Sequence, residues 1–131
     1  MSAKMSAETN ALNWFEISVA DMERATKFYE QSFDIKLQPA EMSGMQINMF
    51  PANGMNGGVG GSLVKSQMHH PSATGAVIYL NANPDLQHIA DRIEKEGGKI
   101  IMPKMLINEQ TGYMAIFTDT EGNTVGLHSG N

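Results

Sequence analysis

The sequence predicts an α+β fold in which two tandem βαβββ repeats form one open, curved sheet shaped like a cup. The main observation is a pair of helix-like segments, 21–29 and 85–93, whose apolar residues recur with the spacing of one buried helix face. Each segment follows one strand-like stretch and precedes three more. Because 131 residues suit one ordinary domain, the two half-units are expected to share a core.

Residues 13–19 open the first repeat and alternate between apolar and polar side chains, as a strand with one buried face does. The side chains expected to face the core are Phe15, Ile17 and Val19. Those left free for function are Trp14, Glu16 and Ser18.

The rest of the first repeat is expected to be a helix, a hairpin and a short strand. Asp21 is a suitable N-cap for a helix that ends near Phe33. Residues 35–50 predict two strands that turn near Ser43-Gly44. A glycine-rich turn and a short strand follow over 53–64.

The second repeat shows the same order after a polar connection. This connection contains the adjacent His69 and His70, which we interpret as solvated, since neighbouring side chains in an extended segment point to opposite sides. The elements expected after it are a strand over 76–82, a helix over 85–96 closed by Gly97-Gly98, a hairpin over 100–118 and a final strand over 124–128.

These elements divide the chain into a flexible N-terminus over 1–10 and a single domain over 11–131. Within the domain we expect repeat one over about 13–64, the linker over 65–74 and repeat two over about 75–128.

Composition excludes several kinds of partner. The net charge of −5, with no cluster of basic residues, argues against nucleic-acid binding. The absence of cysteine excludes disulfides and thiolate ligands. No secretory signal and no apolar stretch of membrane-spanning length is present. We therefore expect a cytoplasmic protein with no nucleic-acid and no membrane partner.

Four stretches of sequence carry a resemblance to a known family. They are Phe-Glu-Ile-Ser-Val at 15–19, Ala-Thr-Lys-Phe-Tyr at 25–29, Gly-Gly-Lys at 97–99 and Phe-Thr-Asp-Thr-Glu-Gly-Asn at 117–123. With them the chain resembles, from Asn13 to His128, the vicinal oxygen chelate superfamily of glyoxalases, extradiol dioxygenases, and bleomycin- and fosfomycin-resistance proteins. The resemblance implies the glyoxalase/bleomycin-resistance/dioxygenase fold and a homodimer. Because this scaffold hosts enzymes and binders alike, it implies the fold more strongly than the function.

The resemblance also implies where a divalent metal would bind, on His or Glu residues of the first and last strands of each half. The corresponding positions in this sequence are Trp14, Ser62, Val77 and Gly126. An indole only donates hydrogen bonds, valine and glycine offer no side-chain donor atom, and a lone serine hydroxyl is a poor ligand. We therefore expect no metal and no other cofactor.

We expect the cup to bind a small organic molecule without a metal. The candidate ligand-binding residues are Trp14, Ser18, Ser62, Val77, Asn81, Thr124 and Gly126, and the candidate catalytic residues are Glu16, Tyr79 and His128. A competing interpretation makes Glu16 a rim carboxylate paired with a base, and His128 an exposed residue near the C-terminus. For Trp14 the competing interpretation is that its ring fills the volume of a lost ligand.

Two enzymatic alternatives stay open. One is a metal-independent isomerase or epimerase in which Glu16 is the general base and Tyr79 or His128 returns the proton. The other is a divalent-metal-dependent lyase or dioxygenase of the glyoxalase type, which requires ligands at other positions of the same strands. The sequence also leaves open whether the cup forms within one chain or across a dimer.

Overall fold

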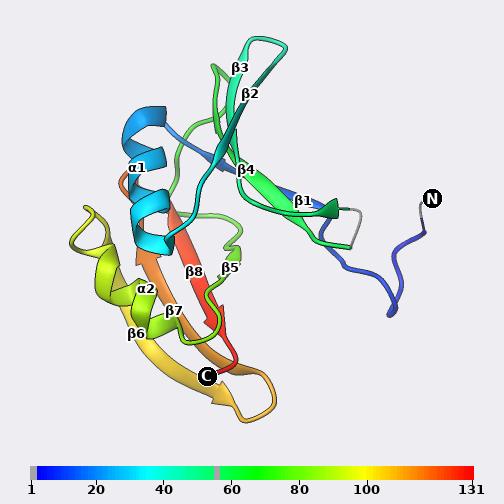
Figure 1. Cartoon of the computed structure of the whole chain (residues 1–131), viewed down its shortest axis with the longest axis vertical. Coiled ribbons are helices and arrows are strands. Elements are labelled where there is room, and N and C mark those ends of the chain that lie inside the picture. The colour runs from blue at the N-terminus through cyan, green and yellow to red at the C-terminus, as the bar shows by residue number, and fades with distance from the viewer. Residues whose placement is uncertain (1–2, 55–56) are drawn as a thin grey trace.

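The computed structural model describes residues 3–54 and 57–131. Met1, Ser2, Met55 and Asn56, which belong to the N-terminal segment and the glycine-rich turn of the sequence analysis, lie outside the described residues. Within the described part, two four-stranded sheets with one helix each form two modules that follow one another along the chain (Figure 1). The predicted tandem βαβββ arrangement is confirmed.

The first module is built from five elements. They are β1 (Trp14–Ser18), α1 (Met22–Phe33), β2 (Gln38–Met42), β3 (Met45–Met49) and β4 (Gly60–Lys65). The strand order is β1-β4-β3-β2, with β1 parallel to β4 and the other neighbours antiparallel. The first strand of the module therefore lies at one edge, beside the last.

The second module repeats this topology. Its elements are β5 (Tyr79–Asn81), α2 (Leu86–Ile93), β6 (Lys99–Asn108), β7 (Gly112–Thr118) and β8 (Thr124–Ser129). The strand order is β5-β8-β7-β6, again with a parallel pair at the edge and antiparallel pairs elsewhere.

Local sequence signals set the helix starts and the first hairpin. Asp21 Oδ1 accepts a hydrogen bond from the backbone N–H of Arg24 at 3.0 Å, and Asp85 caps α2 in the same way at 2.9 Å. The β2–β3 hairpin turns at Ser43 and Gly44, which both have positive φ. A two-residue hairpin turn requires this backbone, and glycine adopts it without a steric cost.

Two strands differ in length from the prediction. β4 begins at Gly60, two residues earlier than the expected Ser62, because its ladder with β1 extends to Trp14. β5 covers only Tyr79–Asn81 instead of 76–82. Just before this strand, the carbonyl of Ile78 accepts a hydrogen bond from the backbone N–H of Gly126 in β8 at 2.8 Å.

Helix α2 is also shorter than predicted. It ends at Ile93 instead of near Glu96, because the N–H of Gly98 returns to the Ile93 carbonyl at 2.9 Å in a closing turn. The two glycines therefore close the helix as predicted, but the helix itself ends about one turn earlier than expected.

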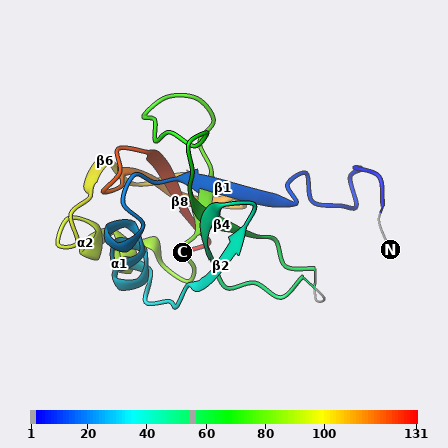
Figure 2. The ribbon, with the colours of Figure 1, turned by 90° about the horizontal axis from the view of Figure 1, so that it is seen from above.

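One hydrophobic core is shared by the two modules. Helices α1 and α2 lie side by side (Figures 1 and 2), and each packs on one face of its own sheet. Phe28 and Tyr29 of α1 pack against Phe117 of β7, with ring centroids 5.9 and 6.4 Å apart, and all three residues are buried. The core therefore continues across the module boundary, as expected of half-units that cannot bury their faces alone.

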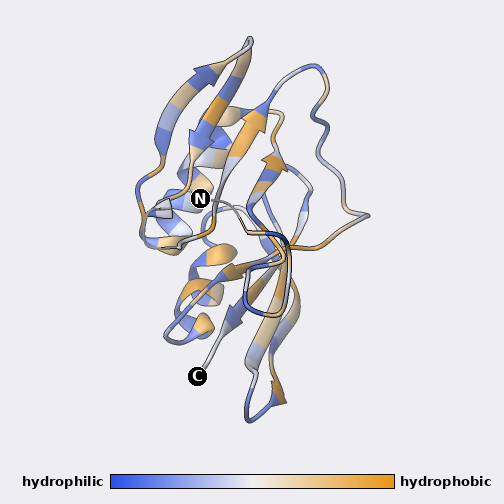
Figure 3. Ribbon diagram, turned by 90° about the vertical axis from the view of Figure 1, so that its right-hand side faces the viewer, coloured by the Kyte–Doolittle hydropathy of each residue, from blue (hydrophilic) through white to orange (hydrophobic). Residues whose placement is uncertain are grey.

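The distribution of hydropathy follows this layering. Figure 3 shows hydrophobic and hydrophilic stretches interleaved along the strands and helices, as burial of one face requires. In residues 3–54 and 57–131, no helix is long and apolar enough to span a membrane. The N-terminal segment extends from the start of β1 away from the two helices (Figure 2).

Candidate functional site

The open face of each sheet, which its helix leaves uncovered, carries the residues predicted for the site. Equivalent ladders place them beside one another in pairs, because residues that are opposite in a parallel ladder point to the same face. The pairs are Trp14 with Gly60 and Glu16 with Ser62 in the first module, and Tyr79 with Gly126 and Asn81 with His128 in the second.

An aromatic ring covers a glycine at the same place in both modules. A Cβ atom at Gly126 would collide with the ring of Tyr79, and one at Gly60 would lie 3.4 Å from Cζ3 of Trp14. The two glycines therefore leave room for the rings to lie flat against the sheet. Trp14 is 47% exposed and Tyr79 is 46% exposed, so both rings keep a free side.

Three predicted residues from the two modules line one cavity of about 240 Å³. Glu16 and Ser18 come from β1, and Thr124 comes from β8. The wall also includes His70, Ser72, Thr74, Asn123, Ile78 and Val125. The connection between β4 and β5 supplies His70, Ser72 and Thr74 to this wall. Figure 2 shows the connection as a loop rising beside β1 and β8.

The same connection supplies a base for Glu16. His69 Nε2 lies 2.8 Å from Glu16 Oε1, and His69 Nδ1 lies 2.7 Å from Ser66 Oγ. The His69 side chain is 19% exposed and that of Glu16 is 44% exposed. The prediction of a solvated linker is therefore wrong for His69. Glu16 is a half-exposed carboxylate paired with a base, which is one of the two interpretations weighed from the sequence.

The two other catalytic candidates lie apart from Glu16. His128 Nε2 donates to the carbonyl of Thr111 at 2.6 Å. Among the residues that the structure describes, neither Tyr79 nor His128 forms a hydrogen bond with Glu16. Within one chain, no hydrogen bond therefore connects Glu16 to either residue for the transfer of a proton.

The remaining ligand-binding candidates are only partly available. Asn81 Oδ1 accepts hydrogen bonds from the backbone and side chain of Asn83, at 3.0 and 2.9 Å. Ser62 is buried, whereas Val77 lies just before β5 and is 38% exposed. The hydroxyl of Thr124 donates to the Ala73 carbonyl at 2.9 Å, which leaves its oxygen free to accept.

A divalent metal does not fit the positions that the resemblance assigns to its ligands. Of Trp14, Ser62, Val77 and Gly126, only Ser62 has a side-chain oxygen, and it is buried. In the described ranges no three His, Asp or Glu side chains stand close enough to hold a metal ion. The chemistry of these donors supports no Lewis-acid step at this site.

A buried polar network fixes the wall of the cavity. Asp119 accepts the hydroxyl of Tyr29 at 2.7 Å and the side-chain amide of Asn123 at 3.0 Å. The same amide donates to the Ser18 carbonyl at 2.8 Å, so it joins the turn before β8 to β1 across the module boundary. Burial, and then the charge of Asp119, raise the pKa of Tyr29 well above its usual value. Tyr29 therefore stays a donor in this network.

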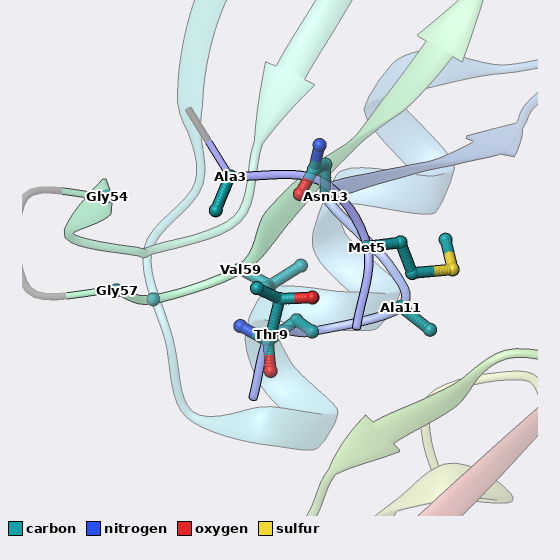
Figure 4. Close-up of a pocket in the computed structure, with 10 residues that line it drawn as sticks. Ala3, Met5, Thr9, Ala11, Asn13, Gly54, Gly57 and Val59 are labelled. Carbon is teal, nitrogen blue, oxygen red and sulfur yellow. The ribbon is translucent and has the colours of Figure 1, made fainter. Parts of the chain in front are cut away.

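A larger cavity, of about 480 Å³, lies between the N-terminal segment and the glycine-rich turn (Figure 4). Small or uncharged residues line it, among them Ala3, Met5, Thr9, Asn13 and Val59. None of the ten predicted site residues is part of its wall. We therefore place the site at the smaller cavity, where side chains of both modules and a charged group meet.

Sequence reasoning missed the part of the site that comes from the connection. His69 contacts Glu16, and His70 lines the cavity, although both lie outside any strand. Adjacent histidines followed by proline were the available signal in the sequence. No local rule says which of the two side chains faces the sheet.

The fold and the site together define a class of protein: a duplicated βαβββ domain with an open sheet face in each half and polar side chains at the junction. A family model for the Glyoxalase/Bleomycin resistance protein/Dioxygenase superfamily matches residues 11–127. The chain belongs to this superfamily, which confirms the resemblance seen in the sequence.

Known relatives agree with this assignment. A glyoxylase-like domain-containing protein of Didymella fabae is 32% identical over 123 residues, which is 86% of this chain and 88% of the relative. A glyoxylase/bleomycin resistance protein/dioxygenase domain from Frankia sp. EAN1pec has a TM-score of 0.68 at 14% identity, over 95% of this chain and all of that one.

Two further solved structures share the fold at low identity. A genomically encoded fosfomycin resistance protein from Listeria monocytogenes has a TM-score of 0.62 at 16% identity and covers 100% of this chain and 94% of its own. Glyoxalase I from Zea mays has a TM-score of 0.64 at 18% identity over 90% of this chain. The chain spans 45% of the maize enzyme, so it corresponds to about half of that protein.

Proposed function

We propose that this protein binds a small organic molecule at the open faces of its sheets, without a metal. The observation that carries the proposal is the cavity of about 240 Å³ in which Glu16 and Ser18 of one module meet Thr124 of the other. A site that joins apolar walls to a few convergent polar groups is typical of small-molecule binding.

Two exposed rings extend the site along the open faces. Trp14 lies two residues before Glu16 on the same face of β1, and Tyr79 occupies the equivalent place on β5. Flat molecules bind more tightly when they stack on such rings, because stacking removes apolar area from water and the ring has a polarised face. Trp14 is therefore assigned the role of a stacking platform.

Homodimerisation in the cytoplasm completes the proposal. Trp14 and Tyr79 are both nearly half exposed in one chain. A second copy that faces these sheets would shield a ligand from water and turn two open faces into a closed cup.

A metal-independent isomerase or epimerase is the second candidate, and the contact between His69 and Glu16 favours it. A general base needs an orienting partner within hydrogen-bond reach, and His69 Nε2 at 2.8 Å is such a partner. In this version Glu16 takes a proton from an acidic C–H group of the ligand and returns it to a neighbouring position. His69 replaces Tyr79 and His128 as the group beside the base.

The test is a screen of a small-molecule library by 15N–1H correlation spectra of the full chain. We expect ligands to shift the backbone amides of Glu16, Ser18 and Thr124 and the indole N–H of Trp14. Ligands that shift only residues around the N-terminal cavity would contradict the proposal.

Trp14→Ala then tests the stacking role. The variant should fold, since Trp14 is 47% exposed. It should weaken binding of flat ligands by about fivefold to a hundredfold, because the lost stacking and burial together are worth on the order of 1–3 kcal/mol. Trp14→Phe keeps a smaller ring and is the matched control. Unchanged affinity in a folded Trp14→Ala protein would remove this role.

A further inference from the structure

The cavity at the module junction has an uneven distribution of charge. In the described part of its wall, Glu16 is the one side chain with a formal charge at neutral pH, and His70 is the other titratable group. Glu16 Oε1 faces His69, while Oε2 has no hydrogen-bond partner among the described residues. One carboxylate oxygen is therefore held in place and the other is open to a ligand.

Ser66 and His69 orient the carboxylate. Ser66 Oγ accepts the backbone N–H of Met68 at 3.1 Å and lies 2.7 Å from His69 Nδ1. One neutral tautomer satisfies every atom: the Ser66 hydroxyl donates to Nδ1, and the Nε2–H group donates to Glu16. The imidazole then holds Glu16 without neutralising its charge.

The order of these three groups superficially resembles a hydrolytic triad, but the geometry favours an orienting role. The described wall of the cavity includes Glu16 but not Ser66. The Ser66 hydroxyl is already engaged in the turn with Met68, and a nucleophile must reach a bound substrate. Ser66 therefore acts through His69 and does not act on a ligand.

The other polar groups of the wall add acceptors. The Ser18 hydroxyl and the His70 imidazole have no partner in residues 3–54 and 57–131. The Thr124 hydroxyl donates its hydrogen bond to the Ala73 carbonyl. The side-chain amide of Asn123 donates to the Ser18 carbonyl and to the Asp119 carboxylate. The free capacity is thus mainly for accepting hydrogen bonds, and it suits a ligand rich in donors.

We propose that this cavity binds a small organic cation, an ammonium or amidinium group carried on a compact apolar body. The inference rests on the proposed function and names its ligand class. The cation would lie at Oε2 of Glu16, next to the hydroxyl of Ser18, and the apolar body against Ile78 and Val125. No lysine or arginine belongs to the described wall, so nothing there repels the cation while the histidines are neutral.

The experiment uses three probes of nearly equal shape: benzylamine, benzyl alcohol and benzoate. Each is titrated into the 15N-labelled full chain near pH 8, and the backbone amides are followed. We expect benzylamine to shift the amides of Glu16, Ser18 and Thr124 and to bind at least about tenfold more tightly than benzyl alcohol, since hydrogen bonds between charged groups are about twice as strong as neutral ones. Benzoate should leave these amides unmoved.

Glu16→Gln removes the charge and keeps the shape of the side chain. It should abolish the preference for the amine over the alcohol. Glu41→Gln, at an exposed position of β2, makes the same change in net charge and should keep that preference. Retention of the preference in Glu16→Gln would overturn the assignment to Glu16.

The outcomes separate this inference from the proposed function. Equal binding of benzylamine and benzyl alcohol at the same amides would overturn the cation class and leave the cavity as a binding site. Tighter binding of benzoate would also overturn it. If none of the three probes moved these amides, while a library screen found ligands on the open sheet faces, the cation site would fail and the cup would stand.

Discussion

Glu121 shows how one carboxylate can join two modules at the scale of single residues. Its Oε1 accepts the backbone N–H groups of Ala20 and Asp21, both at 2.8 Å, and its Oε2 accepts Arg24 Nε at 2.7 Å. Burial raises the pKa of Glu121, but the hydrogen bond from Arg24, with those from Asp21, Thr120 and Ala20, outweighs burial and lowers the pKa to about 2. The turn before β8 is thereby attached to the start of α1.

The low pKa of Glu121 predicts a dependence of stability on pH. A carboxyl whose folded pKa lies below its unfolded value stabilises the fold above the unfolded pKa, about 4.5, and loses that contribution as pH falls toward 2. Glu121→Gln should therefore lower the free energy of unfolding by about 2 kcal/mol at pH 7, a figure reduced to allow for the half-exposed Arg24. The deficit should shrink by pH 2. Urea unfolding at the two pH values measures it.

The control for this prediction is Glu23→Gln, which changes an exposed glutamate in the first turn of α1. It removes the same charge without breaking a hydrogen bond to the other module. An equal loss of stability in both variants, or a Glu121→Gln deficit that stays constant from pH 7 to pH 2, would show that the contact with Arg24 contributes little.

At the scale of elements, the accuracy of sequence prediction followed the range of the interactions involved. The Asp21 N-cap and the Ser43-Gly44 turn depend on neighbours within four residues, and both were predicted correctly. The length of β5 depends on its pairing with β8, and the end of α2 depends on a returning N–H group. No periodicity within a single segment carries that information.

The candidate site divides in the same way. Alternation along β1 predicted Glu16 and Ser18 on one face of the strand, and both line the cavity, since the pleat fixes side-chain direction. The contact between Glu16 and His69 joins residues 53 positions apart through an irregular connection. Its path is set by contacts such as the one from the Ser72 N–H to Asn123 Oδ1 at 3.0 Å, which no strand or helix rule predicts.

Strand β6 provides a prediction about assembly. It is the edge strand of its sheet, and it exposes Ile101, Met105, Leu106 and Ile107 by 54, 47, 51 and 43%. Exposed apolar patches on edge strands are covered in stable proteins or lead to association. We expect the proposed homodimer to bury this strand. Leu106→Lys should raise the dimer dissociation constant at least about tenfold, since a lysine is costly to bury. Sedimentation velocity over a concentration series measures this constant.

Met68→Lys is the matched control for the assembly prediction. Met68 is 88% exposed on the connection between the modules, and it receives the same change in charge. Dimerisation that is equally weakened by both substitutions would point to net charge instead of the β6 surface. A wild-type chain that stays monomeric at high micromolar concentration would remove the proposed dimer itself.

At the scale of the whole molecule, duplication explains both what is kept and what has changed. The two modules keep the same strand order, the same aspartate cap and the same ring over a glycine, so the scaffold is preserved in each half. At the positions that the resemblance assigns to metal ligands, β1 carries Trp14, and Val77 lies just before β5. Within the described residues, the shared core and the hydrogen bonds of Asp119 join the two modules.

The proposed absence of a metal is directly measurable. Metal-stripped protein should keep its melting temperature when saturating Zn, Ni, Co, Mn or Fe(II) is added, and the purified protein should hold no stoichiometric metal. An ion that binds the native state, at a concentration a hundred times its dissociation constant, would add about 2.7 kcal/mol to the free energy of unfolding. The melting temperature would then rise by on the order of ten degrees. The double variant His69→Ala/His70→Ala locates such a rise, since histidine is a common metal ligand and both side chains lie at the candidate site. A rise that disappears in this variant would place the metal at these histidines, beside Glu16, and would also contradict the metal-free proposal. A rise of that size in both proteins, with one metal per chain, would contradict the proposal and restore the metal-dependent lyase or dioxygenase.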